Sequence, residues 1–304
     1  MGLIPPSTLD AITLGEAGTS ETVHVFGSGL VGTLTRPARI DTRRPAVVLF
    51  NAGLVQRSGP FRVYTQLARA IANRGFVVLR FDQSGFGDSP ASSGSADDQQ
   101  AMGAQAALDL ILQETGTHRF VLSGICAGAD AAFDLSLKLN GVAGFVLLDG
   151  LAYTSTGYTM RRMLPNLVRP TKVLARLKRM FVKQSQDTLS DEDFREFPPK
   201  EEAARQLGQL VANDARMLML YTAGAFNYFN HARQARECFG PVVDSERIQV
   251  EHWPQCDHTF YLRRDRERLN TLFCTWLETH FPPTTQVEMT NADADTIRPP
   301  NIDD

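Results

Sequence analysis

The chain has 304 residues, enough to bury a substantial core as one large α/β domain or two small ones. Its 31 basic and 34 acidic side chains give a net charge of −3, which provides no general attraction for nucleic acid. No apolar run approaches the roughly 20 residues of a membrane span, and the N-terminus lacks the basic start and apolar run of a signal peptide. We therefore expect a cytoplasmic protein that binds no nucleic acid and has no membrane span.

The four cysteines are far apart in the sequence and form no C-x-x-C motif. This spacing argues against a zinc site or a disulfide framework and suits a reducing compartment. We expect no metal and no cofactor, and we leave a homodimer open. The cysteines are Cys126, Cys238, Cys256 and Cys274.

Apolar runs and helical patterns alternate along most of the chain, after an N-terminal segment of 20 residues that shows no clear period and predicts only a surface stretch. Continuous apolar runs predict strands buried on both faces, as in a parallel sheet covered by helices. The predicted strands are 22–26, 30–35, 46–50, 76–81, 119–123, 144–148, 216–221 and 247–253; the predicted helices are 61–71, 97–115, 129–139, 230–238 and one around 269–277. About eight mostly parallel strands with helices between them predict a three-layer α/β sandwich.

Two segments depart from this alternation. Residues 151–215 contain no convincing strand and predict a helical lid inserted between the sixth and seventh strands. Residues 282–304 hold four prolines and no aromatic residue, which predicts a disordered tail behind a domain of residues 1–281. Within the insertion, residues 161–183 carry eight basic side chains and no acid. These form either a solvated helix face or a surface for an anionic carrier, such as the phosphates of coenzyme A or an acyl-carrier protein.

One pentapeptide stands at the centre of this pattern. Gly124-Ile125-Cys126-Ala127-Gly128 falls where an apolar run ends and an Ala-rich helical stretch begins. Glycines two residues on either side permit a sharp strand-to-helix turn, which would raise Cys126 onto the top of the sheet. A thiol at a helix N-terminus is favoured as the thiolate, the nucleophilic form.

With about eight strands, this elbow after the fifth and a late histidine, the chain resembles the α/β-hydrolase superfamily. The segment Asp257-His258-Thr259-Phe260 looks like the histidine loop of the serine-aminopeptidase-like (S33) branch, and residues 81–89 (FDQSGFGDS) resemble its loop after the fourth strand. The combination with G-x-C-x-G is similar to bacterial members that use a cysteine nucleophile, including exosortase-associated hydrolases.

The resemblance implies Cys126 as the nucleophile and His258 as its base. The acid most often follows the seventh strand, but residues 222–228 contain no carboxylate. We assign the acid to Asp149, at the end of the sixth strand, with Asn227 as the alternative. An oxyanion hole is expected from the backbone N–H groups of Ala127 and of Gly53 or Leu54.

These assignments predict a hydrolase or acyltransferase that forms an acyl-Cys126 thioester from an ester or thioester. Tyr153, Tyr158 and Met160 of the insertion are expected to line the apolar acyl pocket. A transferase or cyclase of a biosynthetic pathway is a variant of this prediction. The alternative class is a non-catalytic hydrolase-fold protein in which Cys126 contacts a ligand or senses oxidants.

Overall fold

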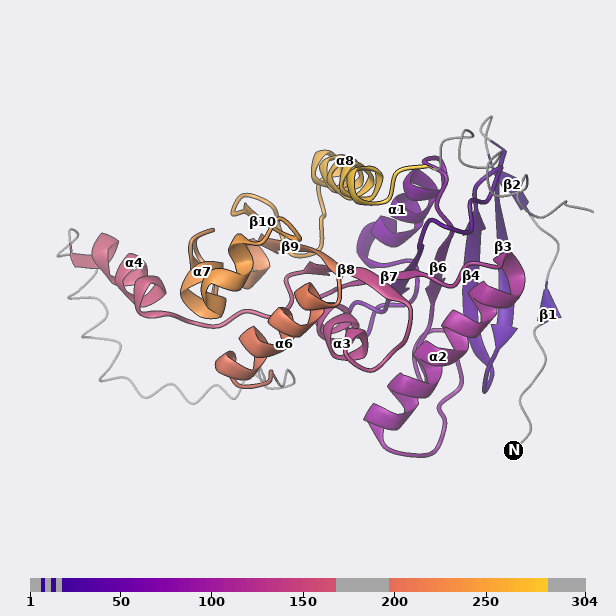
Figure 1. Cartoon of the computed structure of the whole chain (residues 1–304), viewed down its shortest axis with the longest axis horizontal. Coiled ribbons are helices and arrows are strands. Elements are labelled where there is room, and N and C mark those ends of the chain that lie inside the picture. The colour runs from indigo at the N-terminus through magenta and orange to yellow at the C-terminus, as the bar shows by residue number, and fades with distance from the viewer. Residues whose placement is uncertain (1–6, 9–11, 15–17, 168–196, 284–304) are drawn as a thin grey trace, which may run out of the picture.

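The computed structural model of the chain describes residues 7–8, 12–14, 18–167 and 197–283, which form one mixed β-sheet with helices on both faces (Figure 1). The sheet has ten strands in the order β1-β3-β4-β6-β5-β7-β8-β9-β10, and β2 pairs with β3 off this path. The strands are β1 Ser7–Thr8, β2 Ile12–Leu14, β3 Thr19–Phe26, β4 Leu30–Arg36, β5 Ala46–Phe50, β6 Val78–Phe81, β7 Phe120–Ile125, β8 Val142–Leu148, β9 Arg216–Thr222 and β10 Ile248–Trp253.

All eight predicted strands are present, as β3 to β10, with ends shifted by a few residues. The sequence did not predict β1 and β2, which both pair antiparallel with β3 within the first 20 residues. Strands of two and three residues are too short to show an alternating pattern, so the sequence carries no signal for them.

The strand directions agree with the prediction of a mostly parallel sheet. From β6 to β10 every neighbouring pair is parallel, whereas β4 runs antiparallel to both β3 and β6. The helices are α1 Val63–Ala72, α2 Ala96–Thr115, α3 Ala127–Ser136, α4 Thr156–Leu167, α6 Lys200–Ala212, α7 Gln234–Phe239 and α8 Arg263–His280, with short 3₁₀ turns at Pro60–Arg62, Ala223–Ala225 and Gly240–Asp244.

The two faces of the sheet carry separate hydrophobic cores. In the fully buried strand β5, alternate side chains divide between them: Val47 and Leu49 join the core under α1 and α8, while Val48 and Phe50 join the core under α2, α3 and α6. Helices α1 and α8 lie together on one side in Figure 1, and α2 and α3 lie on the other. This is the three-layer α/β-hydrolase sandwich that the sequence predicted.

The connection from β8 to β9 contains α4 and α6. Residues 168–183 of the basic segment 161–183 lie outside the described residues, as does nearly all of the predicted tail. Within the described part of the chain, no helix combines the length and the apolar character needed to cross a bilayer.

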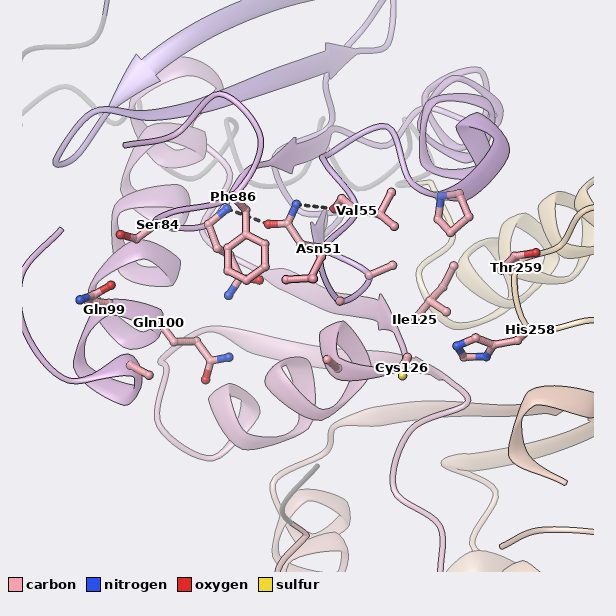
Figure 2. A pocket seen from close by; sticks show the side chains of 17 residues that line it. Asn51, Val55, Ser84, Phe86, Gln99, Gln100, Ile125, Cys126, His258 and Thr259 are labelled. Atoms are coloured by element: carbon pink, nitrogen blue, oxygen red, sulfur yellow. Dashed lines mark hydrogen bonds between the residues drawn. The ribbon is translucent and has the colours of Figure 1, made fainter. Parts of the chain in front are cut away.

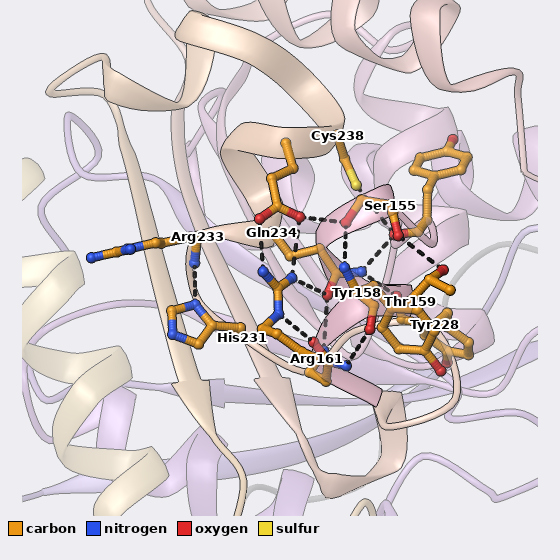
Figure 3. Close-up of polar contacts among 12 residues, drawn as sticks. Ser155, Tyr158, Thr159, Arg161, Tyr228, His231, Arg233, Gln234 and Cys238 are labelled. Carbon is orange, nitrogen blue, oxygen red and sulfur yellow. Dashed lines mark hydrogen bonds and ion pairs between the residues drawn. The ribbon is translucent and has the colours of Figure 1, made fainter. Parts of the chain in front are cut away.

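Polar contacts fix the start of the insertion to α7 and to the segment before it (Figure 3). The fully buried Gln234 donates hydrogen bonds from Nε2 to the carbonyl oxygens of Tyr153 (2.7 Å) and Tyr228 (2.5 Å). Arg161 forms an ion pair with Glu237, at 2.8 Å between Nη1 and Oε1. The first turns of α4 are therefore held beside α7. Helix α6 also packs against α7.

Candidate active site

The nucleophile elbow has the backbone that the glycine pattern predicted. Cys126 stands between β7 and α3 with φ 56° and ψ −120°, a conformation that is costly for a residue with a side chain. Its N–H donates to the carbonyl of Leu148 at 2.8 Å, and its own carbonyl accepts from Ala129 at 2.8 Å. The surrounding strand and helix thus hold a strained residue at the carboxyl edge of the sheet.

Both elbow glycines are required by close backbone approach. A Cβ atom on Gly124 would lie 2.2 Å from the carbonyl carbon of Gly128, and a Cβ on Gly128 would lie 2.4 Å from the carbonyl oxygen of Asn51. Since backbone atoms cannot move aside as a flexible side chain can, any larger residue would force the elbow open. The second contact also brings the loop after β5 against the start of α3.

A buried tyrosine supports the elbow from below. The N–H of Ile125, directly before Cys126, donates a 2.8 Å hydrogen bond to the hydroxyl of Tyr64 on α1. Tyr64 is completely buried, and this burial raises the pKa of its hydroxyl far above the usual range. The phenol therefore stays neutral and can accept the bond.

His258 lies between Cys126 and a buried carboxylate. Its Nδ1 is 2.8 Å from Oδ2 of Asp149, which is fully buried, and its ring lies beside the Cys126 side chain at the wall of the same pocket (Figure 2). The hydrogen bond to Asp149, and then the neighbouring Cys126, raise the pKa of His258 to about 10, against the opposing effect of desolvation. The imidazole is thus protonated near neutral pH.

Asp149 is oriented by the next strand. Its Oδ1 accepts from the N–H of Thr222 at 2.6 Å and its Oδ2 from the Thr222 hydroxyl at 2.5 Å. Because β8 and β9 are parallel neighbours, their carboxyl ends bring these residues together. Asn227, the alternative acid partner, is exposed and makes no contact with His258 in the described chain. Asp257 closes its own loop by accepting from the N–H groups of Thr259 and Tyr261, each at 2.9 Å.

The residues expected to form the oxyanion hole line the same pocket as Cys126 and His258. Ala127 opens α3, so its N–H has no acceptor within the helix. Gly53 has φ +55° and, together with Leu54, forms the middle of a turn closed by a 3.1 Å bond from Val55 to Ala52. The geometry makes these N–H groups candidate donors to an oxygen bound above Cys126.

This loop is tied to a buried acid that the sequence analysis did not assign to the site. Asp82, fully buried after β6, accepts from the backbone N–H and the Nη1 of Arg57, each at 2.5 Å, and from Asn51 Nδ2 at 3.2 Å. Asn51 in turn accepts from the N–H of Gln83 at 2.7 Å. A polar residue following an entirely apolar strand, as Asn51 does, was the available signal.

The pocket has a volume of about 860 Å³ and is lined by 17 side chains that are mostly apolar. Tyr153, Tyr158 and Met160 are not among these residues, so the prediction that they line this pocket is corrected. Tyr153 packs on Phe239 with ring centroids 5.8 Å apart, the Tyr158 hydroxyl donates to the Asn227 carbonyl, and Met160 is 59% exposed. Helix α4 is turned toward α7, which carries these side chains away from Cys126.

The other three cysteines are buried and none is disulfide-bonded. Burial raises the pKa of Cys256 to about 12 and that of Cys274 to about 11, and it also raises the pKa of Cys238. These thiols are therefore poor nucleophiles, whereas Cys126 is partly exposed in the pocket. No cluster of three or more metal-binding side chains occurs among the residues that the structure describes.

Residues 42–223, more than half of the chain, match the family model of the serine aminopeptidases S33. The chain belongs to this family. With its sheet order and elbow, the chain is a member of the α/β-hydrolase superfamily. No protein of curated function matches it.

Solved structures similar to this chain share its fold at low identity. An esterase of Pyrococcus furiosus is 12% identical, with a TM-score of 0.52 over 91% of each chain. A thermophilic esterase from Thermogutta terrifontis is 18% identical, with a TM-score of 0.50 over 90% of this chain and 99% of its own. A dienelactone hydrolase-like promiscuous phosphotriesterase from metagenomic libraries is 14% identical, with a TM-score of 0.50 over 92% and 100%. At such identities the likeness is one of fold.

Proposed function

We propose that the protein is a cysteine-dependent acyl hydrolase or acyltransferase that acts on esters or thioesters through an acyl-Cys126 thioester. The observation that carries the proposal is the position of His258, which is hydrogen-bonded to Asp149 and lies beside Cys126 of the elbow in the same pocket. This arrangement supports a thiolate–imidazolium pair that attacks a carbonyl carbon.

In the first half-reaction the Cys126 sulfur bonds to the carbonyl carbon, and the oxygen becomes an oxyanion. The N–H of Ala127 and that of Gly53 or Leu54 stabilise this charge, each contributing about 3–4 kcal/mol by analogy with other enzymes. The imidazolium of His258 protonates the departing alkoxide or thiolate, and the carbon–leaving-group bond breaks. Asp149 stabilises the imidazolium before this transfer and keeps the ring oriented after it.

In the second half-reaction neutral His258 removes a proton from water or another nucleophile, which attacks the thioester carbonyl. The carbon–sulfur bond breaks, the thiolate returns, and His258 is again protonated. Because a thioester also reacts with amines, alcohols and thiols, transfer or cyclisation is a natural variant of the same chemistry.

Delivery of the acyl group on coenzyme A or a carrier protein is part of the proposal. It is based on the eight basic and no acidic residues of 161–183. Among the described residues no Lys or Arg lines the pocket around Cys126, so the phosphates of such a carrier would be bound outside this lining. Reversing Lys172, Arg176 and Arg179 to Glu should then weaken a carrier-bound substrate much more than a small ester.

The decisive experiment is intact-mass analysis after incubation with activated acyl thioesters. We expect a single acyl adduct that maps to Cys126, is absent in Cys126→Ala, and forms at least about 100-fold more slowly in His258→Ala. Failure to acylate, or an adduct that forms equally fast without His258, would contradict the proposal. Selective oxidation of Cys126 by peroxide without any acylation would instead favour the ligand-binding or redox-sensing alternative.

A further inference from the structure

The end of the pocket away from His258 carries side-chain amides. Figure 2 shows Ser84, Gln99 and Gln100 there, with Phe86 between them and the Cys126 end. Gln83, which follows Asp82 in the loop after β6, lines the pocket too. An acyl chain attached to Cys126 would therefore pass an apolar middle section and then meet polar groups.

Some of the polar side chains at this end already form hydrogen bonds within the protein, and others do not. Gln99 Nε2 donates to the carbonyls of Ser92 (2.8 Å) and Gly94 (3.0 Å), and the Ser84 hydroxyl bonds that of Ser92 at 2.9 Å. The side-chain amides of Gln83 and Gln100 make no hydrogen bond with any described residue, although both side chains are half-buried at the pocket wall. Each offers one acceptor oxygen and two N–H donors.

The charge of the lining narrows the class of ligand. Of the 17 residues around the pocket, only His258 and Cys126 have ionisable side chains, and none is Asp, Glu, Lys or Arg. A carboxylate or phosphate at the far end would lose its hydration without gaining an opposite charge, and an ammonium would do the same. A neutral group that both donates and accepts matches the two amides.

We propose that Gln83 and Gln100 form a distal subsite that selects acyl groups with an apolar stem and an uncharged hydroxyl or carboxamide at the far end. The inference rests on the proposed acyl-Cys126 chemistry and names the substrate class for it. A volume of about 860 Å³ also exceeds what an acetyl group needs, as expected for a longer acyl chain.

A second pocket adjoins this one and would select a different class of acyl tail. It shares Gln100 and Ala127 with the Cys126 pocket but is lined by Asp97 and Asp130, which would attract a cation, and by Asp134, which is already paired with Lys138 at 2.6 Å. If an acyl tail reached past Gln100 into this second pocket, substrates with a terminal ammonium would be preferred.

The test uses thioesters of one small thiol with matched acyl tails in several chain lengths. An alkanoyl chain ending in methyl is compared with its ω-hydroxy and ω-ammonium isosteres, and an ω-carboxamide is compared with the isosteric ω-carboxylate. We expect the hydroxyl and carboxamide tails to exceed the methyl, ammonium and carboxylate tails in kcat/KM by about three- to tenfold for each hydrogen bond gained. Gln100→Leu and Gln83→Leu should each shift this ratio toward the methyl tail. Gln105 lies on the exposed side of α2, the helix that carries Gln100, and Gln105→Leu should leave the ratio unchanged.

The outcomes separate the two proposals. Acylation of Cys126 by every tail at similar kcat/KM would overturn the subsite while leaving the proposed function standing. A preference for the ammonium tail would overturn it in favour of the acidic pocket. Absence of acylation by all substrates, including an acetyl thioester, would count against the function itself.

Discussion

A Cβ atom placed on Gly224 would lie 2.4 Å from Nδ1 of His258. Gly224 follows β9, in the stretch where the family resemblance led us to look for the acid. In this protein that position carries no side chain, and the space is filled by the imidazole ring. The carboxylate beside His258 is that of Asp149, which directly follows the adjacent strand β8 and accepts hydrogen bonds from Thr222.

Gly224→Ala should therefore displace the His258 ring. Gly224 has no positive φ, so alanine is compatible with the backbone and the clash with the ring is the main effect. We expect kcat/KM for an acyl thioester to fall by about 100-fold, as for a displacement near 1 Å in an active site. Gly208→Ala in α6 is the control, because a Cβ there meets nothing within 4 Å. It should keep full activity and raise the free energy of unfolding by up to about 1 kcal/mol. Full activity of Gly224→Ala would contradict this account of the site.

Asp149→Asn should change the pH profile at its alkaline end. The proposed ion pair between the Cys126 thiolate and the imidazolium needs protonated His258, so activity in the wild type should be lost as pH rises through about 10. Removing the carboxylate removes the largest cause of the raised pKa, so the alkaline limit should move to lower pH. Activity at pH 7 should also fall, by up to about 10⁴-fold. Acylation rates across a pH series check both effects, and an unshifted alkaline limb would exclude Asp149 as the partner of His258.

The interaction between His258 and Asp149 also makes the stability of the protein depend on pH. Because the folded-state pKa of His258 is raised from 6.5, its contribution to the free energy of unfolding is present in full below about pH 6.5. This contribution is lost as pH rises toward about 10. Urea unfolding of the wild type and Asp149→Asn at several pH values should show a difference that shrinks over this range. A difference that grows with pH would contradict the linkage.

Arg57→Gln should destabilise the loop that carries Gly53 and Leu54. Asp82 is fully buried, and losing its charged partner leaves a buried carboxylate with fewer bonds, at a cost of about 3–5 kcal/mol. Arg43→Gln is the matched control, since its pair with Asp41 is exposed and should contribute less than about 1 kcal/mol. Chemical denaturation compares the two variants. Equal losses would show that the buried carboxylate does not need Arg57.

Tyr64→Phe should weaken the elbow from below. It leaves the buried N–H of Ile125 without its 2.8 Å acceptor, which should lower the free energy of unfolding by about 1–3 kcal/mol. Tyr261→Phe removes an exposed hydroxyl and should cost almost nothing. A stability of Tyr64→Phe equal to that of the control would mean that the elbow does not depend on this bond.

Much of the fold could be predicted because its signals are local. The all-apolar runs that became β5 and β7, and the helical spacing in α1, depend on burial that every residue of the run shares. The short strands β1 and β2 could not be predicted in this way, since only pairing with β3 makes them strands. The positions of Tyr153, Tyr158 and Met160 were misjudged for a similar reason. A helical pattern shows which face is apolar but not which neighbour that face meets.

The sequence by itself determined the identity of the candidate nucleophile, because the backbone of a G-x-C-x-G turn is dictated by the five residues that form it. It also pointed to His258 and offered Asp149 against Asn227. Only the tertiary structure decided that Asp149 is the residue against His258, since the two are 109 positions apart and meet where β8, β9 and the loop after β10 end at one sheet edge. The space beside Gly224 and the free amides of Gln83 and Gln100 were likewise visible only in three dimensions. Such features depend on contacts between distant segments, and no local pattern of residues records them.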